Sequence, residues 1–231
     1  KLIVDGLLGK DYATGRTEKR SLKYRLWRRS NEVIRAINQY IISESKKEKI
    51  KILDLGCADG LMIKNISKYF NTEATGVELS KDLFLMAKKK CPEAQIYNKD
   101  IKNLDFLKDE KFDVIICTAV LEHLEDSSSA IKNIEERLSK NGITIWTVPD
   151  PFWEHIATSV GHLEEEQHHH IPNLDELKNM ATTNKLFVLE SKKFMFSPIG
   201  FPFEIKIEKF LRKLGLSFLM ANQLIIAQKS F

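Results

Sequence analysis

The chain has few of the residues that mark unusual classes of protein. Its 231 residues include only 3 cysteines, 6 prolines and 10 glycines, which excludes collagen-like, disulfide-framework and low-complexity proteins. No run of about 18 unbroken apolar residues occurs, so no transmembrane helix is expected, and the first residues do not form a signal-peptide pattern. The formal net charge is only +4, with 43% hydrophobic and 29% charged residues. This composition is typical of a single globular domain with a full core.

The cysteines, Cys57, Cys91 and Cys117, are odd in number. Cys117 lies in an apolar run that is typical of a strand, where a disulfide partner is hard to place. We therefore expect a reducing compartment and a cytoplasmic protein.

Positive charge is concentrated near the beginning of the chain. Apolar residues recur at helical spacing between 22 and 42, which predicts one amphipathic helix or two shorter ones. The basic face of such a helix usually lies in solvent and serves solubility. The alternative is that it binds an acidic substrate, a lipid surface or a nucleic acid. The basic residues are Arg16, Lys19, Arg20, Lys23, Arg25, Arg28 and Arg29.

From residue 49 onward, strand and helix patterns alternate. Five strand patterns with helices between them predict a parallel, doubly wound α/β sheet with helices on both faces. Asn141-Gly142 is expected to form the turn before the fifth strand. After Pro149 the pattern changes to a His- and Glu-rich connection from His155 to His170, a helix, a strand, a second helix and a last strand. The expected strands are 49–55, 74–79, 94–97, 112–118, 143–148, 187–196 and 221–227, and the expected helices are 61–70, 81–90, 129–138, one from about 173, and 204–214.

These patterns divide the single domain into three parts. Residues 1–48 are expected to form an N-terminal helical cap and residues 49–150 the core of alternating strands and helices. Residues 151–231 are expected to form a lid together with the last two strands.

A glycine-bearing turn follows the first strand. Asp54 closes that strand, and the turn from Gly56 to Gly60 lets backbone approach a ligand, because glycine has no Cβ and tolerates unusual dihedral angles. Taken alone, such a turn often serves packing only. Further candidates follow the next strands: Glu78 after the second, and Asp100 with Ile101 after the third.

Parallel strands place their carboxyl ends at one edge of the sheet, where ligands bind. A carboxylate such as Glu78 accepts hydrogen bonds from ribose hydroxyls, and Asp100 accepts one from an adenine amino group. The segment from Thr118 to Leu124 reaches the same edge after the fourth strand. The sequence therefore predicts an adenosine site at this edge.

These motifs resemble the class I S-adenosylmethionine-dependent methyltransferases, particularly the small-molecule branch of ubiquinone and menaquinone biosynthesis. The resemblance spans about Ile50 to Pro149. It is carried by Leu53-Asp54-Leu55-Gly56-Cys57-Ala58-Asp59-Gly60, Gly76-Val77-Glu78-Leu79-Ser80, Asn98-Lys99-Asp100-Ile101, and Phe112-Asp113-Val114-Ile115-Ile116-Cys117 leading into Val120-Leu121-Glu122-His123-Leu124.

The resemblance implies a seven-stranded Rossmann-like sheet whose last strand is antiparallel. It implies S-adenosylmethionine as cofactor, S-adenosylhomocysteine as product, and no metal. It also implies that 49–150 is the cofactor-binding core and that the lid in 151–231 lies on the substrate side. The residues after the first strand would surround its methionine end, Glu78 its ribose and Asp100 its adenine, with an arginine of the N-terminal helix, Arg28 or Arg29, at its carboxylate. The cofactor-binding set is Asp54, Gly56, Cys57, Ala58, Gly60, Glu78, Leu79, Asp100, Ile101, Thr118, Leu121, His123 and Arg29.

Two features test this resemblance. Family members usually carry glycine where this chain has Ala58, and alanine tolerates positive φ less well. A nicotinamide-dependent dehydrogenase also uses a glycine turn and a ribose-binding acid, but Asp54 and the spacing to Gly60 fit that fingerprint poorly.

Methyl transfer from a sulfonium is an in-line displacement that needs alignment but no covalent enzyme intermediate. A hydroxyl acceptor would benefit from a base, and His123 and His168 are the candidates; the alternative is that His123 only shapes its loop.

A metal site is disfavoured, because adjacent histidines seldom point at one centre. The histidines and acids concerned are His155, His162, His168, His169, His170 and Glu164 to Glu166.

The acceptor is expected to be a small molecule, lipidic, saccharide or quinone-like, methylated at oxygen or carbon. Peripheral membrane contact is compatible with the sequence, and both a monomer and a homodimer are open. The alternatives are a non-catalytic cofactor-binding scaffold and an RNA methyltransferase that uses the basic helix.

Aromatic residues near the C-terminus suggest core packing or, as the alternative, an apolar acceptor pocket: Phe194, Phe196, Phe201, Phe203, Phe210 and Phe218.

Overall fold

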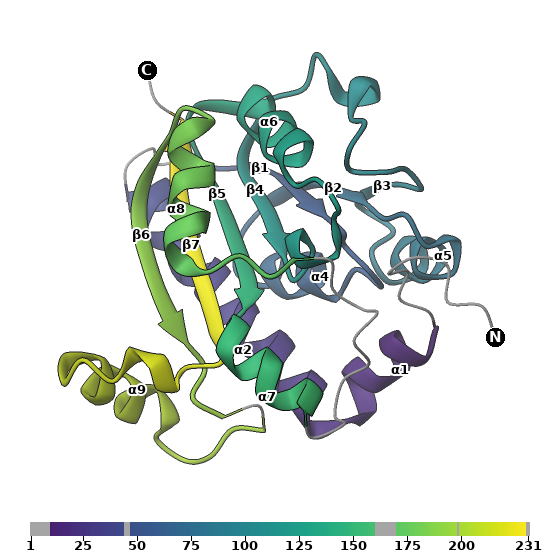
Figure 1. Cartoon of the computed structure of the whole chain (residues 1–231). Helices are drawn as coiled ribbons and strands as arrows, with labels where there is room; N and C mark the ends of the chain where they lie inside the picture. The colour runs from purple at the N-terminus through teal and green to yellow at the C-terminus, as the bar shows by residue number, and fades with distance from the viewer. Residues whose placement is uncertain (1–9, 44–46, 160–169, 198, 230–231) are drawn as a thin grey trace.

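The computed structural model describes residues 10–43, 47–159, 170–197 and 199–229. Its centre is a seven-stranded sheet in the order β3-β2-β1-β4-β5-β7-β6 (Figure 1). The strands β1 to β5 pair in parallel, and β7 pairs antiparallel with both β5 and β6. This confirms the predicted sheet. The strands are β1 Ile50–Leu55, β2 Thr72–Val77, β3 Gln95–Tyr97, β4 Phe112–Thr118, β5 Leu138–Pro149, β6 Leu186–Phe194 and β7 Asn222–Lys229.

Helices cover both faces of the sheet, and α6 and α8 lie on the face nearer the viewer in Figure 1. The helices are α1 Lys10–Glu18, α2 Arg20–Ile37, α4 Leu61–Ile66, α5 Lys81–Lys90, α6 Ser128–Arg137, α7 Pro151–Ser159, α8 Leu174–Thr183 and α9 Glu204–Lys213. Short turns of other helix types are η1 Asn38–Ile42, η2 Asp105–Leu107, η3 Leu121–His123 and η5 Ser217–Leu219.

Two hydrophobic clusters fill the space between the sheet and its helices. In β1, Ile52 belongs to the cluster under α2 and α4, whereas Leu53 belongs to the cluster under α6 and α8. In β4, Val114 and Ile115 divide in the same way. Successive side chains of a strand point to opposite faces of the sheet. A sheet with helices packed on both faces therefore needs strands whose residues are apolar without interruption. That requirement explains the unbroken apolar runs of the sequence.

Two predicted boundaries are wrong. The connection expected from His155 begins as a helix, α7, and His155 lies on it. The turn expected at Asn141 and Gly142 lies inside β5, which starts earlier because Phe112 pairs with Leu138 across a register shift. Asn141 keeps the positive φ, 63°, that a turn residue would have.

Candidate functional site

The turn after β1 has the backbone geometry that its glycines suggested. Gly56 and Gly60 have φ of 70° and 80°, and Ala58 has φ of 49°. A Cβ on Gly56 would lie 2.5 Å from a methyl carbon of Val120. The amides of Gly56 and Cys57 both donate to the carbonyl of Val77. The turn is therefore held against the end of β2, and Ala58 adopts the left-handed conformation despite its Cβ.

Glu78, just after β2, is buried and contacts this turn. One carboxylate oxygen accepts the amide hydrogen of Ala58 at 2.8 Å, and the other accepts that of Ser80 at 2.8 Å. Burial raises the pKa of Glu78, although the hydrogen bonds from these backbone amides lower it. Each carboxylate oxygen has a second lone pair, so Glu78 can still accept hydrogen bonds from a ligand hydroxyl.

Asp54, at the end of β1, is 2% exposed. Its Oδ2 has no hydrogen-bond partner among the described residues. Burial raises the pKa of Asp54 to about 7, the charge of Glu78 adds to the rise, and the charge of Arg16 opposes it. A buried carboxylate oxygen without a partner is costly, and a cationic ligand group at this position would satisfy it.

On the other side of the site, α2 presents two neighbouring guanidinium groups. Within the described part of the chain, the Nε atoms of Arg25 and Arg29 are buried and lack hydrogen-bond partners. Arg29 donates to Asn222 at 3.0 Å, and burial together with the charge of Arg25 lowers its pKa. The pair would be stabilised by an anion such as a carboxylate. Arg28, the other expected carboxylate partner, instead donates to Glu208 at 2.6 Å.

These groups fit the expected cofactor on chemical grounds. S-adenosylmethionine carries positive charge at its sulfonium and ammonium groups and negative charge at its carboxylate. Asp54 and the pair Arg25 and Arg29 have buried polar atoms without partners in the described structure, and their charges are complementary to those groups.

The end of β3 lies beside the end of β2. Asn98 donates to the carbonyls of Glu78 and Leu79 at 2.9 and 2.7 Å, which ties the two loops together. Asp100 accepts the amide hydrogen of Lys102 at 2.9 Å and is partly exposed. Ile101 is buried. The structure thus places the predicted adenine-side residues on adjacent strand ends.

The residues after β4 close the site from the side of β5. Ala119 has φ of 57° and donates its amide hydrogen to the carbonyl of Thr147 at 2.7 Å. Leu121 is buried in η3, and His123 of the same turn is partly buried. Thr118, the last residue of β4, is also partly buried.

Of the other histidines, the structure describes His155 and His170. His155 is exposed on α7, and His170 is exposed and lies 3.6 Å from Glu176. Across the described ranges, no group of three or more His, Cys, Asp and Glu residues is placed to hold a metal ion. The second candidate base, His168, lies outside the described residues, as do His162, His169 and Glu164 to Glu166.

Sequence reasoning missed how α1 covers the turn. Arg16 was expected on a solvated helix face, but it is buried and lies 3.0 Å from the carboxylate of Asp59, to which Lys90 also binds. Ala13 of α1 packs against Ala58 of the turn. The available signal was Asp59 itself, a charged residue inside a buried turn, which requires a partner of opposite charge.

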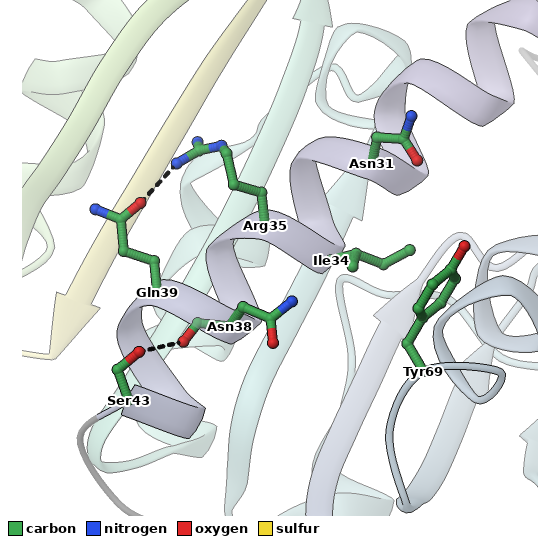
Figure 2. Close-up of a pocket in the computed structure, with 7 residues that line it drawn as sticks. All are labelled: Asn31, Ile34, Arg35, Asn38, Gln39, Ser43 and Tyr69. Carbon is green, nitrogen blue, oxygen red and sulfur yellow. Dashed lines mark hydrogen bonds between the residues drawn. The ribbon is translucent and has the colours of Figure 1, made fainter.

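A cavity of about 520 Å³ lies elsewhere, beside the end of α2 (Figure 2). It is bounded by η1, which leads toward the start of β1 and therefore lies at the other edge of the sheet. None of the predicted cofactor residues lines it. Its lining is Asn31, Ile34, Arg35, Asn38, Gln39, Ser43 and Tyr69.

Comparison with known proteins agrees with this geometry. Residues 24–190 match the family model of a methyltransferase domain. The ubiquinone biosynthesis O-methyltransferase of Coxiella burnetii is 30% identical over 127 residues, 53% of this chain and 54% of that protein. The dTDP-3-amino-3,4,6-trideoxy-alpha-D-glucopyranose N,N-dimethyltransferase of Streptomyces venezuelae is 26% identical over 119 residues, 48% of this chain and 49% of that protein. The chain spans about half the length of the curated relatives it matches.

Solved structures show the same fold. An S-adenosylmethionine-dependent methyltransferase from Clostridium acetobutylicum superposes with a TM-score of 0.68 over 96% of this chain and 98% of that chain, at 15% identity. The family model covers most of the chain, and the resemblance seen in the motifs is confirmed at the level of the family. The chain therefore belongs to the methyltransferase domain family.

Proposed function

We propose that this protein transfers the methyl group of S-adenosylmethionine to a small-molecule acceptor. The observation that carries the proposal is that one sheet edge holds both an acid and a pair of guanidiniums with buried atoms that lack partners in the described structure: Oδ2 of Asp54 and the Nε atoms of Arg25 and Arg29. Asp54 would face the cationic groups of the cofactor and Arg29 its carboxylate. Family membership and the ubiquinone O-methyltransferase relative support the same activity.

The remaining site residues are assigned by their place along the edge. Glu78 would accept hydrogen bonds from the ribose hydroxyls, and Asp100 would accept one from the adenine amino group. The other assignments are Gly56, Cys57, Ala58 and Gly60 along the methionine end, Leu79 and Ile101 beside the adenosine, and Thr118, Leu121 and His123 near the sulfonium.

The chain's part in the reaction is alignment. The bound cofactor would supply an electrophilic methyl group; the acceptor's lone pair would form the new bond while the carbon–sulfur bond breaks. Positioning the two reactants in line supplies much of the acceleration. For a hydroxyl acceptor, His123 or His168 would take the released proton. We propose oxygen as the methylated atom, as in the O-methyltransferase relatives, with carbon as the alternative.

The protein would work as one domain in the cytoplasm, with the cap at 1–48, the core at 49–150 and the lid at 151–231. Its cysteines are free and buried, which suits a reducing compartment. No helix in the described ranges is long and apolar enough to span a bilayer. An RNA methyltransferase is less well supported, because Arg16, Arg28 and Arg29 are engaged within the protein.

Calorimetric titration with S-adenosylmethionine tests the proposal. We expect binding to the wild type, and Glu78→Gln should weaken it about tenfold or more, because a charged acceptor of hydrogen bonds is lost. The matched control is Glu136→Gln, which changes an exposed glutamate on α6. A well-folded protein that binds neither S-adenosylmethionine nor S-adenosylhomocysteine would refute it. Binding without methyl transfer to any acceptor would instead favour the scaffold alternative.

A further inference from the structure

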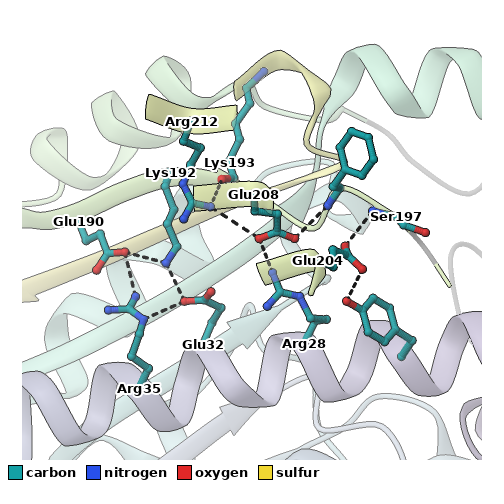
Figure 3. A network of polar contacts seen from close by, with 12 residues as sticks. Arg28, Glu32, Arg35, Glu190, Lys192, Lys193, Ser197, Glu204, Glu208 and Arg212 are labelled. Carbon is teal, nitrogen blue, oxygen red and sulfur yellow. Dashed lines mark hydrogen bonds and ion pairs between the residues drawn. The ribbon is translucent and has the colours of Figure 1, made fainter. Parts of the chain in front are cut away.

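Helix α9, in the segment between β6 and β7, turns its charged face inward. Glu204 and Glu208 are 2% and 1% exposed. Figure 3 shows both carboxylates pointing toward α2, where Glu204 accepts a hydrogen bond from Tyr24 at 2.5 Å and Glu208 one from Arg28 at 2.6 Å. Glu208 also accepts the amide hydrogen of Phe196 at 3.0 Å. The acidic face of α9 is therefore fully engaged with the protein.

The outer face of α9 is apolar. Phe203, Ile207, Phe210 and Leu214 recur at helical spacing, and they are 73%, 38%, 61% and 57% exposed. A helix at the surface of a globular protein normally buries such a stripe and exposes its charges. Contiguous exposed apolar side chains mark an interaction surface. The expectation of core packing is confirmed for Phe194. It is wrong for the other five phenylalanines, which are exposed: Phe196, Phe201, Phe203, Phe210 and Phe218.

The charges around this stripe have one sign. Lys206, Lys209 and Lys213 are exposed on α9. Between residues 196 and 221 the sequence has no acids other than Glu204 and Glu208, which are buried. The ammonium group of Lys206 lies 5.6 Å from the ring centre of Phe203. Aromatic and aliphatic side chains flanked by lysines are typical of helices that lie in the interface of an anionic bilayer.

The surface continues around α9 toward the N-terminal helices. Trp27, Ile199 and Phe201 are exposed beside a cavity of about 610 Å³. Its charged lining residues are the basic Arg20 and Lys23 and one acid, Glu18. Apolar groups with a net positive charge therefore continue beyond α9.

This surface lies at the same edge of the sheet as the candidate cofactor site. In Figure 1, α9 lies beyond the end of β6 and the start of β7, and α7 begins at the neighbouring end of β5. On α2, Arg28 binds the acid of α9, and the next residue, Arg29, binds Asn222 at the start of β7. A molecule resting on α9 would thus be held close to the opening of the site.

We propose that the α9 surface, formed by Phe203, Ile207, Phe210 and Leu214 with the lysines of α9, docks on an anionic lipid bilayer. The apolar side chains enter the headgroup region, and the lysines contact lipid phosphates. Docking turns the edge of the sheet at the carboxyl ends of β1 to β5, where the candidate cofactor site lies, toward the membrane. This inference goes beyond methyl transfer and is tested without it.

Cosedimentation with vesicles tests the docking. We expect the wild type to bind vesicles of equal parts phosphatidylcholine and phosphatidylglycerol, and to bind phosphatidylcholine vesicles far more weakly. Phe210→Ser should lower the affinity about tenfold or more, because an interfacial aromatic group is lost. Lys206→Gln and Lys209→Gln should each lower it about fivefold, an effect that disappears in high salt.

The matched control is Phe187→Ser. Phe187 is 62% exposed, like Phe210, but lies at the start of β6, at the opposite edge of the sheet. This variant should bind vesicles like the wild type. Both variants change exposed side chains, so melting temperature and calorimetric binding of S-adenosylmethionine should stay unchanged. That second readout separates a failure of docking from a failure of the proposed activity.

Three results would overturn the docking proposal. One is a wild type that does not sediment with the anionic vesicles. Another is equal vesicle binding by the Phe210→Ser and Phe187→Ser variants. The third is a wild-type dimer, seen by light scattering, that Phe210→Ser converts to monomer without any change in vesicle binding, since the stripe would then be a contact between two copies of the chain.

Discussion

Replacing Asp54 by asparagine should stabilise the ligand-free protein at neutral and higher pH. Burial raises the pKa of Asp54 from 3.8 to about 7, a rise of about three units. Each unit corresponds to about 1.4 kcal/mol, so keeping Asp54 ionised in the folded state costs about 4 kcal/mol. Asparagine has a similar shape and carries no charge, and the variant avoids this cost.

The sign of the pH dependence follows from the direction of the shift. Because the folded-state pKa of Asp54 lies above its unfolded value, the folded state holds the proton more tightly. The free energy of unfolding of the wild type should therefore fall as the pH rises from about 4 to about 7, and level off above that. The advantage of Asp54→Asn should be largest above pH 7 and vanish near pH 4.

Binding of the cofactor should reverse the preference of Asp54 for its protonated form. A cationic group beside Asp54 favours its ionised form, so binding of S-adenosylmethionine should release a proton below about pH 7. The affinity of the wild type should then fall about tenfold for each pH unit below that value, until the pKa of the complex is reached. In Asp54→Asn the affinity should be weaker and nearly independent of pH over this range.

Urea unfolding at several pH values measures the first effect, and calorimetry in two buffers of different ionisation enthalpy measures the proton release. The exposed Asp109→Asn serves as the control and should show neither effect. A stability difference that is equal at pH 4 and pH 8, or binding without proton release, would refute the role assigned to Asp54.

Three further substitutions test the structure around the site. Gly56→Ala places a Cβ 2.5 Å from Val120 at φ of 70°, so urea unfolding should show a loss of about 1–3 kcal/mol, and an unchanged midpoint would contradict the turn geometry. Arg28→Met leaves Glu208 of α9 buried without its 2.6 Å partner and should cost about 3–5 kcal/mol in the same measurement; a loss below about 1 kcal/mol would mean that the pair is exposed. Gly76→Ala would crowd the neighbouring side chains of the core at 2.8 Å and should lower the melting temperature by several degrees; a wild-type value would show that the core has room there.

The order of the strands, and most of the helices between them, could be predicted from the sequence because these elements depend on local patterns; α7 was missed. The apolar runs of β1 and β4 reflect burial on both faces, which any sequence for a doubly covered sheet must satisfy. Glu78 and Asp100 could be placed at one edge because parallel strands share the direction of their ends. The turn from Gly56 to Gly60 could be predicted because positive φ angles favour glycine at these positions.

Contacts between distant segments depend on tertiary packing: a charge in a buried turn, such as Asp59, signals that a partner is needed, but the sequence does not say which residue it is. Arg16 and Arg28 belong to one basic cluster in the sequence, yet packing pairs the first with Asp59 and the second with Glu208. A helical pattern defines an apolar face, but which face is buried depends on what the neighbouring helix presents. In α9 the arginine and tyrosine of α2 attract the acidic face inward, because a buried charge needs a partner more than an apolar side chain needs cover.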